Sequence, residues 1–344
     1  MTSERLRALL QAIRDRSAAV FGDFCLDAYW LMDPARSEVS IETGKRTRPV
    51  REQRYSLGGA GNIVANLLDL GVAGVYAVGV LGDDLFGREL MRQLATPRAD
   101  GRPGADIRGI LIQKEEWATP VYGKPYVGDD EQERMDFGVG NTIRPEKEER
   151  LLRALRDTLG WAQAVIVNQQ LPRGVNSEAV IAGINGLAAE HPDRFFIVDA
   201  RDRSERYLGM ICRLNEHEAA RLCGRPRPLA WTVSLDECRA FAEEIGGVTG
   251  KPVFISRGER GALVFAEGRT HEIPAVRVTG PTDPVGAGDT SISAIAAALA
   301  AGAAAVEAAE LANLAAGVTV RKLRTTGTAT PAEILAVAGA GGQQ

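Results

Sequence analysis

The chain has 344 residues, of which 45% are hydrophobic and 25% charged, and its formal net charge is −4. This composition is ordinary for a soluble globular protein, and the acidic balance argues against a nucleic-acid partner held by phosphate neutralisation. The four cysteines form no CxxC pair and the three histidines complete no zinc spacing, so we expect reduced thiols in a cytoplasmic protein. The charged N-terminus lacks a secretory signal, and the alanine-rich run at residues 292–306 is too short for a membrane span.

Short apolar runs alternate with helical patterns along most of the chain. Strands are expected at residues 17–24, 75–80, 164–168, 195–199 and 253–256. Helices are expected at residues 61–71, 87–94, 177–190 and 234–245. This alternation predicts an α/β fold with a mostly parallel sheet that helices cover on both faces. In such sheets ligands bind beyond the carboxyl ends of the strands.

Two stretches interrupt the alternation. Residues 30–55 are rich in Arg, Glu and Thr without a helical period, and short β patterns follow one another within residues 110–137. These patterns could pair into a small separate sheet. We therefore expect one domain over residues 1–340, with lid segments at about 28–56 and 110–137 within it.

The stretch Asp283–Thr290, DPVGAGDT, combines glycines with the start of a long helical pattern. Glycine allows the backbone to turn so that several N–H groups point outward, and a helix start adds N–H donors and partial positive charge. Such a site suits an anion, above all a phosphoryl group in transfer. Asp289 beside it could accept a proton from an attacking alcohol. The alternative is that Asp289 only caps the helix.

This stretch resembles the DTxGAGDT signature of the ribokinase-like (PfkB) sugar kinases, and other motifs along the chain support that resemblance. The resemblance implies a three-layer α/β/α fold with a small β-sheet lid, and ATP-dependent phosphorylation of a sugar hydroxyl. It also implies that Gly286, Ala287 and Gly288 hold the γ-phosphoryl group while Asp289 is the catalytic base. Pro284 stands where the family commonly has threonine, close to where a monovalent cation such as K⁺ would bind.

Other segments extend the resemblance over most of the chain. The segment YSLGGAGNIVAN resembles the family's GGxxxN element, which implies that Gly58 and Gly59 let the sugar approach the backbone and that Asn62 binds its hydroxyls. The NxxE motif at residues 215–218 implies that Glu218 organises Mg²⁺ through water. The same resemblance implies a set of ATP-binding residues, namely Asn215, Arg257, Gly258, Gly261, Asp283 and Asn313.

Two further segments are similar to the heptose-7-phosphate kinases within this family. GDFCLDAYW at residues 22–30 resembles their GDxxLDxYW, and Asp27 would bind sugar hydroxyls there because a carboxylate accepts two hydrogen bonds at once. EQERMDF at residues 131–137 resembles their QQxxRxDxE, which adds Arg134 and Asp136 to the substrate site. The family's DYxKG segment is here NQQLPRG, so the acid is lost and Arg173 replaces the lysine.

A basic cluster in the first lid segment has two interpretations. Its members are Lys45, Arg46, Arg48, Arg51 and Arg54. They could be a solvated face of two strands, as charge runs usually are. They could also clamp a sugar that already carries a phosphate, since Arg binds phosphate through paired hydrogen bonds. Lys124 and Arg134 of the second lid segment could then converge on the same group.

Several functions stay open at the level of the sequence. We expect a kinase whose acceptor is a sugar or sugar phosphate, with ribose, fructose, ketodeoxygluconate or a nucleoside as other acceptors. A non-catalytic sugar or nucleotide sensor on the same fold is the alternative from another class. No nucleic acid or membrane is expected as a partner. The resemblance implies a homodimer joined through the lid, because open strand edges tend to pair.

Overall fold

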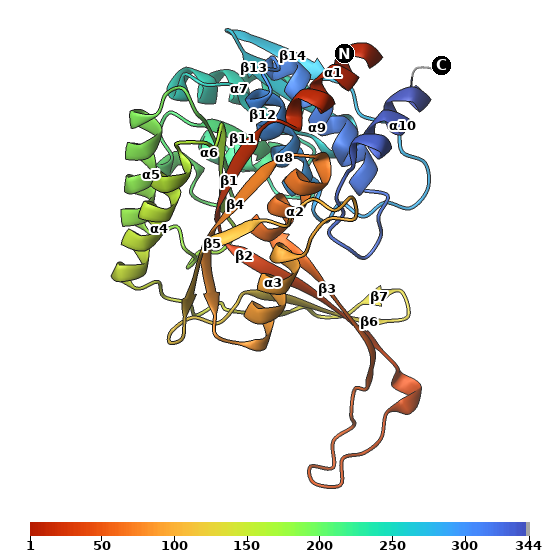
Figure 1. The fold of residues 1–344 in the computed structure, drawn as a ribbon. Coiled ribbons are helices and arrows are strands. Elements are labelled where there is room, and N and C mark those ends of the chain that lie inside the picture. Colours follow the sequence, from red (N-terminus) through yellow and green to blue (C-terminus); the bar gives the residue numbers. More distant parts are fainter. Residues whose placement is uncertain (342–344) are drawn as a thin grey trace.

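The computed structural model describes residues 1–341, which form two sheets of different size (Figure 1). The large sheet has the order β14-β13-β12-β11-β10-β9-β1-β4-β5. Its strands are β1 (Ser17–Gly22), β4 (Gly74–Gly82), β5 (Asp106–Gln113), β9 (Ala164–Gln169), β10 (Phe195–Ala200), β11 (Ile211–Asn215), β12 (Val253–Ser256), β13 (Ala262–Ala266) and β14 (Arg269–Ile273). Pairing is parallel from β5 to β12 and antiparallel from β12 to β14.

Helices cover both faces of the large sheet (Figure 1). One layer contains α1 (Ser3–Ile13), α2 (Ala60–Leu70), α3 (Leu85–Ala95), α8 (Ala287–Ala300), α9 (Ala305–Thr319) and α10 (Pro331–Gly341). The other contains α4 (Pro145–Thr158), α5 (Glu178–Glu190), α6 (Glu216–Leu222) and α7 (Leu235–Thr249). Strand β1 shows why two layers are needed. Ala18 and Val20 pack into the first core while Ala19 and Phe21 pack into the second, as the two-residue period of a strand requires.

The small sheet has the order β3-β2-β6-β7, and β8 also pairs with β6. Its strands are β2 (Phe24–Met32), β3 (Val50–Gly59), β6 (Val121–Val127), β7 (Asp130–Glu131) and β8 (Met135–Phe137). This is the expected lid, and it stands at one end of the large sheet (Figure 1). Among the described residues, no helix has the length and apolar character that crossing a membrane demands.

The expected first strand at residues 17–24 is split between the two sheets at Asp23. The Asp23 carboxylate is buried and accepts hydrogen bonds from the backbone N–H groups of Gln170, Leu171 and Val175, at 2.8 to 2.9 Å. These bonds hold the loop after β9 against the end of β1. The chain therefore changes sheets at this carboxylate, and β2 begins at the next residue.

The second lid segment begins later than expected. Residues 110–113, assigned to the lid from the sequence, are the end of β5 at the edge of the large sheet. The prediction was wrong there because Ile110 and Leu111 are buried in the two different cores, which only a strand covered on both faces allows.

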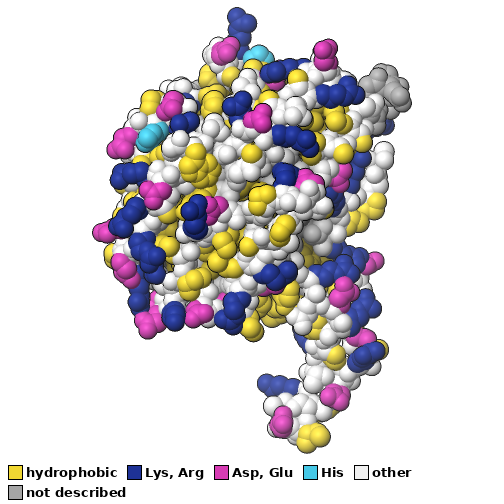
Figure 2. Space-filling view, viewed as in Figure 1, with side chains coloured by type: hydrophobic (Ala, Val, Ile, Leu, Met, Phe, Trp, Pro, Cys, Tyr) yellow, Lys and Arg dark blue, Asp and Glu magenta, His cyan; other side chains and the backbone are white. Residues whose placement is uncertain are grey.

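Residues 33–49 join β2 to β3 and form an arm that projects away from the body of the molecule (Figures 1 and 2). A single bridge between Val39 and Arg46 and a short 3₁₀ turn at Pro34–Arg36 are its regular structure. The Ile41 side chain near the end of the arm is fully exposed at 102%. The arm thus presents apolar surface far from either core.

Candidate active site

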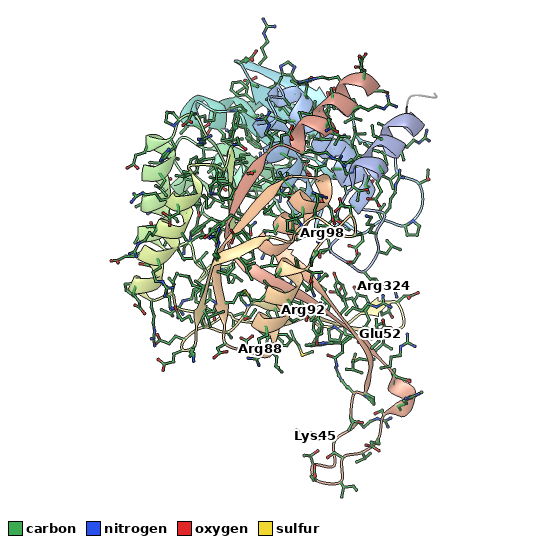
Figure 3. The ribbon with its side chains drawn as sticks, in the orientation of Figure 1. Lys45, Glu52, Arg88, Arg92, Arg98 and Arg324 are labelled. Carbon is green, nitrogen blue, oxygen red and sulfur yellow. The ribbon has the colours of Figure 1, made fainter. Side chains whose placement is uncertain are left out.

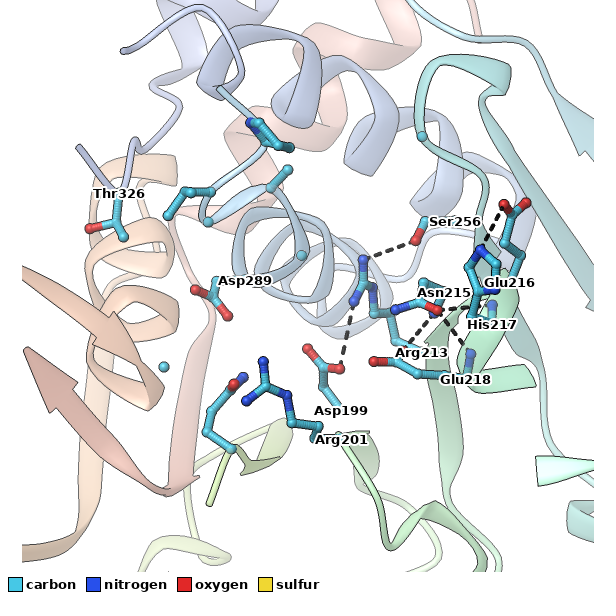
Figure 4. Close-up of a pocket in the computed structure, with 18 of the residues that line it drawn as sticks. Asp199, Arg201, Arg213, Asn215, Glu216, His217, Glu218, Ser256, Asp289 and Thr326 are labelled. Carbon is cyan, nitrogen blue, oxygen red and sulfur yellow. Dashed lines mark hydrogen bonds and ion pairs between the residues drawn. The ribbon is translucent and has the colours of Figure 1, made fainter. Parts of the chain in front are cut away.

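A cleft of about 890 Å³ lies between the carboxyl edge of the large sheet and the lid (Figure 4). Its lining comes from residues at the ends of β10, β11 and β12, from lid strands and from the first turn of α8. The residues predicted from the sequence that line it are Asp27, Gly59, Lys124, Arg134, Asn215, Glu218, Arg257, Gly258, Gly286, Ala287, Gly288 and Asp289. Segments distant in sequence therefore meet where ligands bind in open α/β sheets.

The glycine-rich loop opens directly onto α8. Gly286 has a φ of 80°, in the left-handed region that favours glycine, and it is the N-cap of α8. The N–H of Ala287 donates to the Pro284 carbonyl at 3.1 Å. Gly288 lies in the first turn, where N–H groups have no partner within the helix. A methyl group at Gly288 would lie 3.0 Å from Nη1 of Arg213, so an arginine stands against this loop.

Asp289 is the third residue of α8, and it does not cap the helix. Gly286 is the N-cap, and it has no side chain with which to make a capping hydrogen bond. The Asp289 Oδ2 atom instead accepts a hydrogen bond of 2.8 Å from Nδ2 of Asn62 on α2. Behind it, Asn66 donates to the Asn62 side chain at 3.2 Å and accepts from the Thr290 hydroxyl at 2.8 Å. This network fixes the carboxylate at the cleft.

The cleft environment disfavours the charge of Asp289. Burial raises the pKa of Asp289 to about 7, the Asn62 hydrogen bond opposes the rise, and the charge of Asp199 adds to it. A carboxyl group that titrates near neutrality is suited to accept a proton during a reaction.

Arg213 on β11 supplies positive charge next to the glycine-rich loop. Its Nη1 lies 3.6 Å from Oδ1 of Asp199, and its Nη2 donates to the Ser256 hydroxyl at 3.0 Å (Figure 4). Arg213 and Asp199 are both buried, and Nε of Arg213 has no hydrogen-bond partner among residues 1–341. Because Arg213 lines the cleft, its positive charge can attract an anion bound there.

Asn215 and Glu218 form a capping box at the start of α6. The Asn215 side chain accepts the N–H groups of His217 and Glu218, and the Glu218 carboxylate accepts the N–H of Asn215 at 2.7 Å. Both residues line the cleft, but their local partners are within the helix start. Burial raises the pKa of Glu218, and the nearby Asp199 carboxylate adds to the effect. Two oxygen-bearing side chains thus lie at the same end of the cleft.

Asp27 and Lys124 form an ion pair at the lid end of the cleft. Lys124 Nζ lies 2.5 Å from Asp27 Oδ1, and both side chains are buried. Gly58 does not line the cleft, but a methyl group there would approach the Asp27 carboxylate to 2.5 Å. Gly59 lines the cleft with a φ of 53°. The two glycines therefore leave room for the Asp27 side chain and for the turn into α2.

Asp136 is outside the cleft lining and binds Arg134 instead. Its two carboxylate oxygens accept hydrogen bonds from Nε and Nη2 of Arg134, both at 2.7 Å. The Arg134 guanidinium lies over the Tyr122 ring, 4.7 Å from the ring centroid. Asp136 thus orients Arg134 toward the cleft.

Two of the remaining predicted ATP-binding residues border a second, smaller cavity of about 210 Å³. It adjoins the cleft at Gly258, and Gly261 and Asn313 line it among small side chains of α8 and α9. Asn313 donates its side-chain N–H to the Pro274 carbonyl. Asp283 lines neither cavity, because its carboxylate accepts the backbone N–H groups of Val285 and Arg324, both at 3.0 Å.

Several cleft residues were missed by the sequence reasoning. They are Gln170, Arg201, Arg213 and Thr326, together with Tyr122 of the lid. Arg213 lies two residues before the NxxE motif and Arg201 two residues after the end of the strand expected at 195–199. Their position at the carboxyl ends of strands was a usable signal. A single arginine outside a motif, however, does not stand out in a sequence.

The basic cluster of the first lid segment lies away from the cleft. None of Lys45, Arg46, Arg48, Arg51 and Arg54 lines it. Lys45 is on the projecting arm (Figure 3). Arg46 and Arg48 border a separate cavity of about 440 Å³. Arg54 forms an ion pair with Glu52 at 2.5 Å. The structure therefore favours a solvated face for this cluster in the single chain.

The model of the pfkB family carbohydrate kinases matches residues 130–333, which is more than half of the chain. The chain therefore belongs to the pfkB family of carbohydrate kinases, and the expected family and enzyme class are confirmed.

Two curated relatives have the same description, "Bifunctional protein HldE". The protein from Trichlorobacter lovleyi is 29% identical over 98% of this chain and 65% of its own length. The protein from Azorhizobium caulinodans is 32% identical over 92% of this chain and 63% of its own length. The chain thus spans just under two thirds of these relatives.

Solved structures share the fold. The ribokinase of Arabidopsis thaliana, in complex with ribose and ATP, has a TM-score of 0.72 and 19% identity, with 94% of this chain and 98% of that chain covered. Phosphofructokinase-2 of Escherichia coli, in complex with potassium, has a TM-score of 0.73 and 19% identity, with 95% and 99% covered. The ribokinase-like fold with a large and a small sheet is confirmed.

Proposed function

We propose that this chain transfers the γ-phosphoryl group of ATP to a hydroxyl of a sugar or sugar phosphate, with Asp289 as the catalytic base. The observation that carries the proposal is the position of Asp289. It stands in the first turn of α8, directly after a glycine-rich loop, with burial raising its pKa to about 7. A base and an anion site on adjacent residues are what an attack of a hydroxyl on phosphorus requires.

In the proposed reaction, the acceptor oxygen forms a bond to the γ-phosphorus while the bond from that phosphorus to the bridging oxygen of ADP breaks. Asp289 Oδ takes the hydroxyl proton. The N–H groups at the start of α8 and the Arg213 guanidinium stabilise the negative charge of the transferring group. The lid orients the acceptor and excludes water, which would otherwise compete as the nucleophile.

ATP would lie along the β11–β12 end of the cleft, with its base in the cavity bordered by Asn313. The path is lined by Asn215, Arg257, Gly258 and Gly261.

Mg²⁺ prefers oxygen ligands, keeps several waters, and neutralises phosphate charge when bound. Among residues 1–341, no group of three or more His, Cys, Asp or Glu side chains is placed to hold a metal. Glu218 lines the cleft beside Asn215 and could hold the ion through water. A monovalent cation such as K⁺ stays an expectation from the resemblance.

For the acceptor, the motifs at residues 22–30 and 131–137 support heptose 7-phosphate, because they resemble the heptose-7-phosphate kinases. Ribose, fructose, ketodeoxygluconate and nucleosides are the alternatives. Asp27 and Asn62 would bind the sugar hydroxyls, and Gly59 would let the sugar approach the backbone. The Asp27 carboxylate and the Lys124 ammonium together offer acceptors and donors at the cleft.

We also propose that two copies of the chain join through their lids. Strand β3 is ten residues long and pairs with a strand on one side only. On its other side, Gln93 and Thr326 donate to the carbonyls of Tyr55 and Leu57 at the body end, and no strand covers the end nearest the arm. Open strand edges of this length are usually covered. Ile41 and Val39 of the arm that leads into β3 add exposed apolar surface.

The test of the proposed activity is ADP release from Mg-ATP over a panel of acceptors, with Asp289→Asn as the decisive variant. We expect turnover to fall by at least a hundredfold, since general-base catalysis contributes about 10²–10⁴, while ATP binding by calorimetry stays within about threefold. Asp236→Asn, on the exposed start of α7, is the matched control. Normal turnover by Asp289→Asn would remove Asp289 as the base, and ATP binding without turnover on any acceptor would favour a sensor.

A further inference from the structure

The segment Arg324–Gly327, called the connecting segment below, lies between α9 and α10 and contacts both the lid and the glycine-rich loop. Its first residue has a φ of 55°, in the left-handed region that residues with a side chain rarely adopt. Such a conformation costs free energy and persists only where the surrounding structure enforces it. Contacts with other elements must therefore hold this backbone in place.

The side chains of the connecting segment contact the lid at two places. The Arg324 guanidinium pairs with the carboxylate of Asp129, in the turn between β6 and β7, and lies 5.9 Å from the centroid of the Tyr126 ring (Figure 3). The buried Thr326 hydroxyl donates to the Leu57 carbonyl of β3 at 2.6 Å. Because β3 and β7 are the two outer strands in the order β3-β2-β6-β7, the segment is joined to the lid near both of its edges.

The backbone of the connecting segment is fixed to the glycine-rich loop. The Arg324 N–H donates to the Asp283 carboxylate at 3.0 Å, and the other oxygen of that carboxylate accepts the Val285 N–H at 3.0 Å. A methyl group on Gly286, the N-cap of α8, would lie 3.4 Å from Cα of Thr326, so the segment also packs against the start of that helix. Asp283 thus joins the segment to the loop that is proposed to hold the γ-phosphoryl group.

From these contacts we propose that Thr326 and Arg324 are positioning residues that hold the lid over the cleft and join it to the glycine-rich loop. Their effect on the reaction rests on the proposed function, whereas their hold on the lid does not. The Asp129 carboxylate is 89% exposed, and exposed ion pairs contribute little, so the buried Thr326 hydrogen bond should have the larger effect. When either contact is lost, the lid should open more often, and an acceptor between lid and body should bind less tightly.

Hydrogen–deuterium exchange of the chain without ligands measures how firmly the lid is held. Thr326→Val keeps the shape of the side chain but lacks the hydroxyl, so amides of β3 and β6 should exchange roughly three- to tenfold faster, the range for one hydrogen bond. In Arg324→Gln and in Asp129→Asn, amides of β6 should exchange roughly two- to fivefold faster. The double variant should exchange no faster than Arg324→Gln alone, because both changes remove the same ion pair.

Two variants and one part of the molecule serve as controls. Thr326→Ser retains the hydroxyl and should exchange like wild type. Arg321→Gln changes an arginine just before the connecting segment whose guanidinium donates to the Arg277 carbonyl at 3.4 Å, and it should also leave the lid unchanged. Amides of β9 and β10 in the large sheet should keep their wild-type exchange in every variant, which separates release of the lid from loss of global stability.

The kinetic readout is the split between KM and kcat for the sugar on which the wild-type chain is most active. Thr326→Val should raise KM for that sugar by roughly three- to tenfold and change kcat by less than about threefold. Unchanged lid exchange in both Thr326→Val and Arg324→Gln would overturn the positioning role, and so would equally faster exchange in the large sheet. Faster exchange of the lid alone, without turnover on any acceptor even in wild type, would support the hold on the lid and overturn the proposed function.

Discussion

Asn62 and Asp289 are 227 positions apart, yet a hydrogen bond of 2.8 Å joins their side chains. The Asn62 amide donates to the carboxylate, which favours the ionised form against the effect of burial. Asn66 holds the Asn62 side chain in turn. Two uncharged amide side chains therefore lower the pKa of the carboxyl group that would accept the proton, one directly and one by holding the other in place.

The pKa of Asp289 predicts how the rate depends on pH. A base must be ionised to act, so kcat/KM should rise with pH through about 7 in wild type, where the pKa of Asp289 lies. In Asn62→Ala the donor that lowers this pKa is lost, and the acidic limb should move upward by about one pH unit, as a hydrogen bond to a charged group is worth roughly 1.5–3 kcal/mol.

The measurement is kcat/KM between pH 5 and 9 at a fixed acceptor. Asn185→Ala on α5, whose amide bonds only to the backbone of Arg206 and Leu208, is the control and should leave the limb in place. A limb that stays in place in Asn62→Ala, or moves toward acid, would contradict the assignment of the titrating group to Asp289.

At the scale of elements, the start of α6 serves two purposes. Its capping box satisfies N–H groups that a helix of seven residues would otherwise leave open, and it orients the Glu218 carboxylate toward the cleft. The start of α7 has the same motif in Ser234 and Glu237, neither of which lines the cleft of the candidate active site. The chain thus contains a structural copy of the motif against which its proposed metal role can be compared.

Replacing Glu218 with Gln should separate capping from metal binding. The Gln side chain can still accept the Asn215 N–H, so Tm should change by less than about 3 °C. The carboxylate charge is lost, so the Mg²⁺ concentration for half-maximal rate should rise several-fold. Glu237→Gln is the matched control, with an unchanged Mg²⁺ requirement. If both variants show the same Mg²⁺ dependence as wild type, Glu218 is only a capping residue.

At the scale of the whole molecule, the lid has a surface that the body does not use. The arm of residues 33–49 projects into solvent (Figure 1), and the part of β3 nearest the arm has an edge that no strand covers. Figure 2 shows the arm as a narrow extension with charged and hydrophobic side chains. A second copy of the chain would cover both features at once.

The proposed dimer should depend on the apolar side chains of the arm. Ile41→Asp combined with Val39→Asp should shift the mass measured by light scattering from two chains to one, because each introduced charge would be desolvated at the interface. Leu229→Asp, at a comparably exposed apolar residue (86%) away from the lid, is the control. A wild-type chain that is monomeric at micromolar concentration would rule out the lid-joined dimer.

The sequence by itself determined the features that are local in the chain. Alternating apolar runs and helical patterns predicted the large sheet and its two helical layers, and the DPVGAGDT stretch predicted a glycine turn into a helix with Asp289 beside it. Each rests on interactions within a few residues, such as the φ of 80° at Gly286, so a short pattern is enough to predict it.

Only the tertiary structure decided which distant side chains meet. The bond from Asn62 to Asp289, the guanidinium of Arg213 against Gly288, and the position of Arg201 opposite the lid join segments far apart in the chain. The structure also placed residues 110–113 in the large sheet and the basic cluster away from the cleft. Burial and charge balance depend on packing in three dimensions, and no spacing along the chain encodes them.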